Sequence, residues 1–157
     1  MALDFDSRPA AFPLSKRRLS CVRNNANMPG LMRYHRVPQT NVIIFQDEDG
    51  RVPFLEWFDQ LPAKVQDKCR VRLERLAQLG HELRRPEADY LRDQIYELRI
   101  GLQGINYRIL YFFHRDVAAV LSHGLVKERA VPPAEIDLAV RRKRKFSANP
   151  DRHTYRE

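Results

Sequence analysis

Arginine side chains on two neighbouring predicted strands are the residues in this sequence best suited to chemistry. If the four-residue turn between the strands pairs Ile100 with Ile105, Glu97 faces Arg108, and Arg99 shares their face of the sheet. Two guanidinium groups on one face would form a phosphate clamp, because guanidinium matches phosphate bidentately. An ordinary cross-strand ion pair between Glu97 and Arg108 explains the same residues equally well.

Other titratable side chains lie near the last predicted strand. Lys127 and Arg129 follow its end, and whether they share the arginine face depends on a register that a bulge at Gly124 would change. His123 is the one histidine inside a predicted strand, and imidazole titrates near neutrality. A hydrogen-bonded structural histidine is nevertheless the simpler interpretation of His123.

The sequence contains no glycine-rich phosphate loop, zinc-ligand spacing or serine nucleophile elbow. Cys21 and Cys69 lie far apart without a CxxC motif, which fits reduced cytosolic thiols. We therefore expect no cofactor and no metal. No run of about 18 apolar residues is present, and the N-terminus lacks an apolar secretory segment, so we expect a cytoplasmic protein without a membrane span.

The elements that position the arginines are predicted in the order β-α-α-β-β-β-α. A short strand at 41–45 precedes two helices, which begin at Pro53 and Pro62. A polar connection at 81–93 leads to three strands, and a final helix follows; their ranges are 94–100, 106–113, 117–126 and 134–145. Helices followed by strands favour an α+β fold, with a small antiparallel sheet packed on the two N-terminal helices. The sheet face opposite the arginines is expected to pack on these helices through Tyr96, Leu98, Ile100, Tyr107 and Ile109.

Composition divides the chain into three parts. Residues 1–40 are rich in proline, asparagine and basic residues and are predicted to be a poorly ordered extension. It is interpreted as a bland tail, as an RNA-contacting arm, or as a misassigned start upstream of Met28 or Met32. Residues 41–146 form the predicted domain, and residues 147–157 form a C-terminal tail.

The net charge of +8 comes from the N-terminal extension and from the second half of the predicted domain, whereas the first half of the domain is mildly acidic. Residues 99–145 hold ten Lys and Arg against four Asp and Glu. A basic half favours a polyanionic partner such as nucleic acid or the ribosome. A solvated charged surface is the alternative.

Residues 96–139 resemble the C-terminal half of RelE/HigB-type toxins, particularly their phage-related branch, and the resemblance extends over about 41–146. The matching segments are Glu97-Leu98-Arg99, the strand YRILYFF at 107–113, His123-Gly124, Lys127 and Pro133. The resemblance implies the RelE-like fold. It also implies a toxin of a type II toxin–antitoxin pair, neutralised by an antitoxin that is expected to be a helix-turn-helix protein.

Such toxins enter the ribosomal A site and cut mRNA by attack of a 2′-OH on the adjacent phosphate, without a metal. By resemblance, Arg108 stabilises the developing charge, Arg99 positions the phosphate, and Lys127 contacts the scissile phosphate or assists proton transfer. Further RNA contacts are expected from Arg129, His123, Tyr107, Arg141, Arg142 and Lys143.

The sequence departs from the family pattern at two positions. Glu128 replaces the second lysine after the last strand, and Pro132 replaces a threonine, so the general base is not identified. Two other functions therefore stay open. One is a ParE-like toxin that inhibits DNA gyrase without nuclease activity, and the other is a catalytically decayed RNA- or ribosome-binding module.

Overall fold

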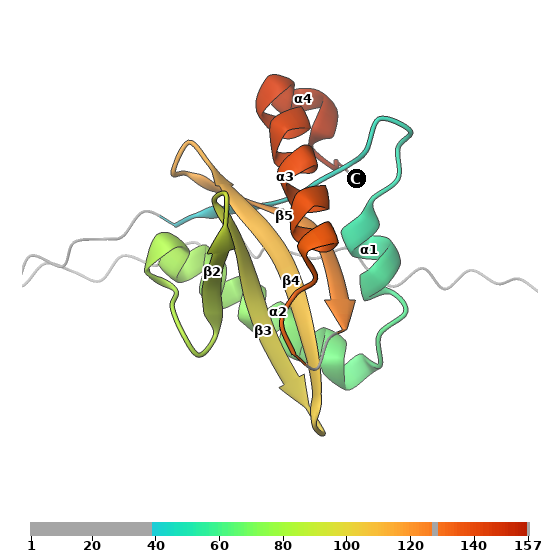
Figure 1. Ribbon diagram of the computed structural model, residues 1–157, viewed down its shortest axis with the longest axis vertical. Helices are drawn as coiled ribbons and strands as arrows, with labels where there is room; N and C mark the ends of the chain where they lie inside the picture. Colours follow the sequence, from blue (N-terminus) through green and yellow to red (C-terminus); the bar gives the residue numbers. More distant parts are fainter. Residues whose placement is uncertain (1–38, 127–128, 157) are drawn as a thin grey trace, which may run out of the picture. The chain divides into compact units, whose positions relative to one another are not determined.

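A computed structural model describes residues 39–126 and 129–156 and shows an α+β fold, which confirms the predicted class (Figure 1). Residues 1–38 of the predicted extension lie outside the described residues. The strands are β1 (Asn41–Ile44), β2 (Ala88–Arg92), β3 (Ile95–Leu102), β4 (Ile105–His114) and β5 (Ala118–Val126). The helices are α1 (Pro53–Phe58), α2 (Ala63–Leu79), α3 (Pro133–Ala148) and α4 (Pro150–His153), with a 3-10 turn at Gly80–Glu82. In the described parts of the chain, no helix is long and apolar enough to cross a membrane.

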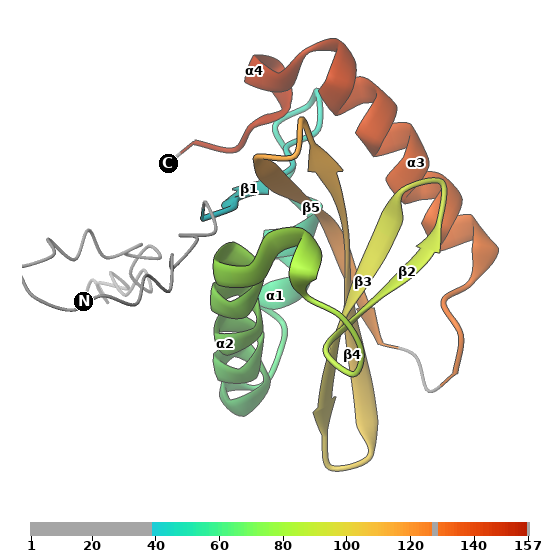
Figure 2. The same cartoon turned by 90° about the vertical axis from the view of Figure 1, so that its left-hand side faces the viewer.

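The five strands form one sheet in the order β1-β5-β4-β3-β2. Strands β2 to β5 pair antiparallel, as expected, and β1 adds a parallel pairing to β5 at the edge. The two helices between β1 and β2 lie on one face of this sheet (Figure 2). This connection carries the chain from one edge strand to the other.

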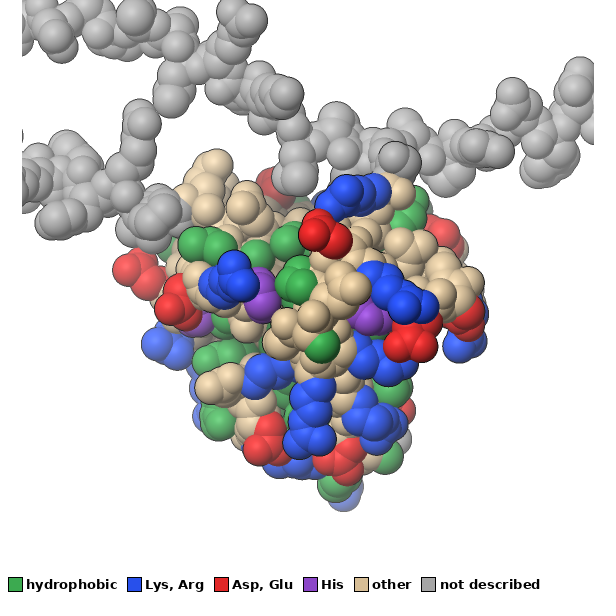
Figure 3. All heavy atoms as spheres, turned by 90° about the horizontal axis from the view of Figure 1, so that it is seen from above, with side chains coloured by type: hydrophobic (Ala, Val, Ile, Leu, Met, Phe, Trp, Pro, Cys, Tyr) green, Lys and Arg blue, Asp and Glu red, His purple; other side chains and the backbone are tan. Residues whose placement is uncertain are grey.

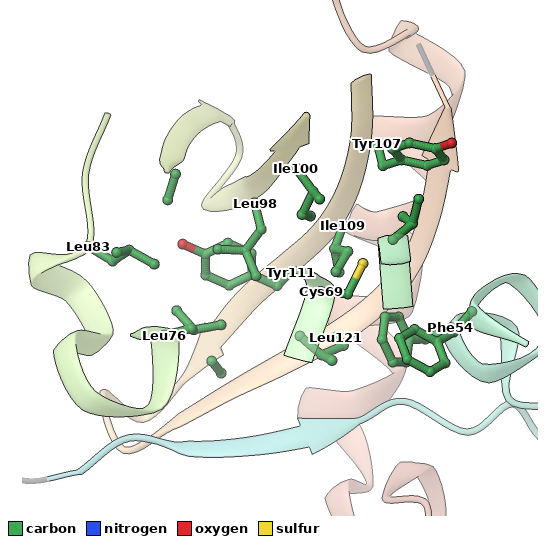
Figure 4. Close-up of a cluster of buried hydrophobic side chains, with 14 residues drawn as sticks. Phe54, Cys69, Leu76, Leu83, Leu98, Ile100, Tyr107, Ile109, Tyr111 and Leu121 are labelled. Carbon is green, nitrogen blue, oxygen red and sulfur yellow. The ribbon is translucent and has the colours of Figure 1, made fainter. Parts of the chain in front are cut away.

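Helices cover both faces of the sheet. On one face, α1 and α2 pack over a core that contains Phe54, Leu98, Ile109 and Tyr111 (Figure 4). The expected helix-facing set of Tyr96, Leu98, Ile100, Tyr107 and Ile109 is confirmed, because all five belong to or pack on this core. On the other face, α3 packs over a second core that includes Phe112 and Phe146. The arginine face is therefore partly covered, and only the part beyond α3 is open.

The sequence does not predict strand β2, because it indicates a polar connection at these residues. Its sequence ADYLR carries three polar or charged side chains, so the apolar alternation of a strand is hidden. Asp93 and Gln94 both have positive φ, 52° and 62°, and connect β2 to β3 in a tight turn. Neither residue is glycine, so the usual hairpin pattern is absent from the sequence.

The pairing of β3 with β4 differs from the predicted register by two residues. Ile100 pairs with Tyr107 instead of Ile105, and Arg99 directly faces Arg108. The predicted four-residue turn is wrong, because Gln103 and Gly104 alone turn the chain, both with positive φ. Side chains alternate with a period of two, so the shift by two leaves every side chain on its predicted face.

A bulge in β5 decides which side chains of that strand reach the arginine face. Leu110 pairs with His123 and Tyr111 with Leu121, so Ser122 is the extra residue. Strict alternation would place His123 on the face of Leu121, and the bulge moves it to the face of α3. The bulge therefore lies at Ser122, whereas the sequence analysis considered a bulge at Gly124.

The last residues of the chain pack against β1. Phe45 forms an antiparallel bridge with Thr154, and the amide of Tyr155 donates to the carbonyl of Ile44 at 2.9 Å. The ring of His153 stacks on Phe45 with centroids 5.2 Å apart. Residues 147–153, predicted as a tail, thus contain the end of α3 and all of α4. Residues 153–155 pair with the chain at the end of β1.

Replacing Gly124 by alanine is expected to lower the free energy of unfolding by about 1–3 kcal/mol, the usual cost of overpacking. A Cβ at this position would overlap the ring of Trp57 on α1. The measurement is urea denaturation of the full chain. Gly101→Ala is the matched control, because its nearest contact would be Asn106 Oδ1 at 3.9 Å. Equal stability of both variants would contradict the close packing of α1 on β5.

Candidate functional site

The open part of the α3-side sheet face carries the two arginines singled out in the sequence. Arg99 on β3 and Arg108 on β4 are direct cross-strand neighbours, and Leu125 of β5 follows Arg108 in the same row. Like charges placed directly opposite each other repel. This pair therefore requires a compensating negative charge nearby.

Glu97 supplies that charge from within the sheet. Its side chain is 1% exposed, and its two oxygens accept hydrogen bonds from Arg99 Nε at 2.7 Å and Arg108 Nη1 at 2.5 Å. The ion pair between Glu97 and Arg108 is thus present, although the two residues are diagonal neighbours rather than opposed. The sequence analysis gave a pair of cations and an ion pair as alternative interpretations of these residues. The structure contains both.

The ion pairs continue to both sides and form an alternating chain of charges. Arg99 Nη2 donates to Asp89 Oδ2 at 2.8 Å, and Asp89 also pairs with Arg85 at 2.6 Å. Hydrogen bonds from Arg85 and the charge of Arg99 hold the pKa of Asp89 below its usual value. We call Arg85, Asp89, Arg99, Glu97 and Arg108 the arginine network; with three cations and two carboxylates, it retains one net positive charge.

The donors of Arg108 are largely enclosed by the protein. Its Nη2 donates to the backbone carbonyl of Arg129 at 2.7 Å, and its Nε is buried and has no hydrogen-bond partner among the described residues. The side chains of Arg108 and Arg99 are 12% and 37% exposed. A phosphate approaching this face would meet guanidinium groups already fixed in place.

The residues after β5 are only partly described. Lys127, expected to act beside the arginines, lies outside the described residues, as does Glu128. The side chain of Arg129 is exposed, and its carbonyl oxygen accepts the bond from Arg108. The backbone of Arg129 therefore belongs to the surroundings of Arg108.

His123 is a buried, hydrogen-bonded histidine. Its Nε2 lies 3.0 Å from Glu135 Oε2 and its Nδ1 2.8 Å from the hydroxyl of Ser122. Burial, reinforced by the charge of Arg142, lowers the pKa of His123 to about 4 against the opposing effect of Glu135. The ring is therefore neutral at pH 7, with both nitrogens engaged within the protein. This arrangement is the hydrogen-bonded histidine of the structural interpretation, and the RNA contact expected of His123 stays a prediction.

The other expected RNA contacts fall in different places. Tyr107 is 7% exposed and lies in the core under α1 and α2, on the face opposite the arginine network. Arg142 lies over the ring of Phe45 at 5.7 Å, and Lys143 donates to the carbonyl of Asp93. Arg141 is exposed on α3. Within the basic run of α3, Arg142 thus packs on Phe45, Lys143 contacts the β2–β3 turn, and Arg141 is exposed.

Sequence reasoning missed Asp89 and Arg85, which complete the arginine network. Asp89 lies in the unpredicted strand β2 and Arg85 precedes it. The sequence pattern therefore did not place either residue beside Arg99. The structure also contains no group of three or more His, Cys, Asp or Glu side chains placed to hold a metal ion, within the residues described.

Residues 56–144 match the family model described as Phage derived protein Gp49-like (DUF891). The chain belongs to the Gp49-like family. This family is related to the RelE and HigB toxins of toxin–antitoxin systems, so membership is consistent with a phage-related toxin that pairs with an antitoxin. No curated protein matches the chain.

Replacing Glu97 by glutamine is expected to lower the free energy of unfolding by about 3 kcal/mol, because it leaves Arg108, whose side chain is 12% exposed, without its counter-charge. Urea denaturation at pH 7 measures the loss. Glu74→Gln, at an exposed position on α2, is the matched control and should change stability by less than about 0.5 kcal/mol. A stable Glu97→Gln protein would show that the network does not contribute to the fold.

Acidification is expected to destabilise the protein partly through His123. Its pKa is about 4 in the folded chain, against 6.5 for a histidine without such surroundings, so the unfolded chain binds more protons between these values. The contribution of His123 to stability is complete above about pH 6.5 and decreases as the pH falls toward 4. Unfolding free energies at pH 7 and pH 5 should differ less in His123→Gln than in the original chain. An unchanged difference would exclude His123 as a source of this pH dependence.

Proposed function

We propose that this Gp49-like protein is a toxin that acts as a metal-independent, ribosome-dependent mRNA endonuclease. The observation that carries the proposal is the arginine network. It holds two opposed guanidinium groups, bridged by the buried Glu97, on the open part of a sheet face. Preorganised cations of this kind stabilise the charge that develops during cleavage of a phosphodiester.

The proposed reaction is an internal transesterification of RNA. The 2′-oxygen attacks the adjacent phosphorus, the bond from phosphorus to the 5′-oxygen breaks, and a 2′,3′-cyclic phosphate and a 5′-hydroxyl result. The 2′-hydroxyl gives up its proton to a base, and the leaving oxygen takes one from an acid. Arg108 stabilises the charged phosphate oxygens and Arg99 positions the phosphate, while Lys127 and Arg129 complete the contacts to the scissile group.

The proposed partners follow from this activity. The mRNA is presented in the ribosomal A site, and a helix-turn-helix antitoxin is expected to neutralise the toxin by covering its basic sheet surface. The net charge of the arginine network supports both, since a polyanion and an acidic protein segment are attracted to the same field. The protein is expected to act in the cytoplasm.

Expression of the full chain in a bacterial host tests this proposal. We expect new mRNA 5′ ends within translated frames, and at least a 100-fold loss of cleavage in Arg108→Ala, the typical cost of removing one group that stabilises transition-state charge. Arg156→Ala, which removes a 70% exposed arginine, is the matched control and should cleave normally.

Blocking translation initiation should abolish the cuts if the ribosome is required. Growth arrest without new 5′ ends would contradict the nuclease and favour a protein target such as gyrase. Folded protein with neither arrest nor cuts would favour a binding module without chemistry.

A further inference from the structure

Asp89 holds Arg99 from the edge of the sheet, on the side opposite to Arg108. It lies on the edge strand β2 and pairs directly with Glu97 of β3, so the two carboxylates lie on the same sheet face. The side chain of Asp89 is 16% exposed, against 1% for Glu97. Arg99 is therefore bound by two carboxylates, one within the sheet and one at its edge.

These two carboxylates bind different nitrogens of the Arg99 guanidinium group. Nε donates to Glu97 Oε1 at 2.7 Å, and Nη2 donates to Asp89 Oδ2 at 2.8 Å. Guanidinium is planar, so two fixed nitrogens determine the direction of the third. The direction of Nη1 is consequently set by Glu97 and Asp89 together.

Nη1 of Arg99 is available to an incoming anion. It forms no hydrogen bond with the described residues, and the Arg99 side chain is 37% exposed. Arg108, in contrast, is 12% exposed and donates to the protein through both Nη atoms. A phosphate that reaches the arginine network can therefore accept a hydrogen bond from Nη1 of Arg99, at a place that the two carboxylates determine.

The carboxylate of Asp89 is itself held in one orientation. Its Oδ1 accepts a hydrogen bond from the backbone amide of Tyr90 at 3.1 Å, and its Oδ2 accepts one from Nε of Arg85 at 2.8 Å. The same Oδ2 binds Arg99. Asp89 thus presents a fixed acceptor to the outer side of the Arg99 guanidinium group.

Pairs of opposite charge are common on this molecule, so pairing alone does not distinguish Asp89. In Figure 3, acidic side chains lie next to some of the Lys and Arg side chains on the face seen from above. The pair of Arg51 with Asp49 has side chains 66% and 56% exposed, and contacts of this kind contribute little. Asp89 differs because its arginine also binds a buried carboxylate and lies directly opposite Arg108.

We propose that Asp89 is a positioning residue of the RNA cleavage reaction, which holds Arg99 so that Nη1 meets an oxygen of the scissile phosphate. The inference rests on the proposed function, since it concerns the same phosphate. Glu97 joins the site to the core, so replacing it disturbs the fold and the site together. Asp89 lies at the edge of the sheet, and its replacement tests the site separately.

Cleavage kinetics of the full chain on ribosomes carrying mRNA test this role. Asp89→Ala is expected to lower kcat roughly tenfold to a hundredfold, because Arg99 is no longer aligned with the phosphate. KM should not rise, since the substitution removes a negative charge beside a polyanion. Asp89→Asn keeps one oxygen acceptor and should give an intermediate kcat. If Asp89 only reduced the local positive charge, the substitution would leave kcat unchanged and lower KM, which would overturn the inference.

Asp93→Asn is the matched control for the change in charge. It removes one negative charge from the turn after β2, where the Asp93 side chain is 55% exposed and pairs with Arg92 rather than Arg99. Asparagine also tolerates the positive φ of this position. This variant should retain the original kcat. Urea denaturation of every variant verifies that it is folded under the assay conditions.

A double-mutant cycle tests whether Asp89 acts through Arg99. In an Arg99→Ala background, adding Asp89→Ala should leave kcat unchanged, because the group that Asp89 holds is already absent. An equal loss of kcat in both backgrounds would show that Asp89 acts independently of Arg99 and would overturn the inference.

NMR of the arginine side chains tests the same contact without catalysis. A guanidinium group held by two carboxylates rotates slowly about its Cζ–Nη bonds and gives separate Nη signals, and Arg99→Lys identifies those of Arg99. Asp89→Ala should merge these signals, whereas Asp93→Asn should leave them separate. Signals already merged in the original chain would overturn the inference. An original chain that cleaves no mRNA would refute the proposed function instead, and the NMR result would still show whether Asp89 holds Arg99.

Discussion

The buried carboxylate of Glu97 is the constraint on which the site depends. A carboxylate that is 1% exposed is very costly to bury alone, so Arg99 and Arg108 must remain beside it. The same carboxylate offsets the repulsion between two arginines placed opposite each other on β3 and β4. The guanidinium groups are consequently fixed before any anion arrives, and the proposed reaction would not have to reorganise them.

The face of each strand residue could be predicted from the sequence, but not the pairing of the strands. Alternation in β3 and β4 places Arg99 and Arg108 together, and this conclusion survived a register error of two residues, because the period of a strand is two. The direct contact between the arginines depends on the tight turn at Gln103 and Gly104. The sequence offered a longer turn with a glycine at each end, and only tertiary pairing decides between them.

The remaining site residues depend on local irregularities and distant partners. His123 faces α3 only because Ser122 is an extra residue in β5, and its neighbour Glu135 comes from another element. Arg142 belongs to a run of basic residues, yet it lies over Phe45 because α3 turns that position inward. A charge run gives the number of cations but not which of them face solvent. The packing of the helix against the sheet determines which cations are buried and which face solvent.

Strand β2 illustrates how one unpredicted element can control an entire surface. Its five residues include Asp89, which extends the arginine network, and Arg92, which anchors the strand to α3. These polar residues hid the strand in the sequence. An edge strand needs few apolar side chains, because β3 and α3 already cover the core, and charged residues on an exposed edge also discourage pairing with other chains. The composition that made β2 look like a loop is therefore what allows it to join the arginine network and α3 through Asp89 and Arg92 at one edge of the sheet.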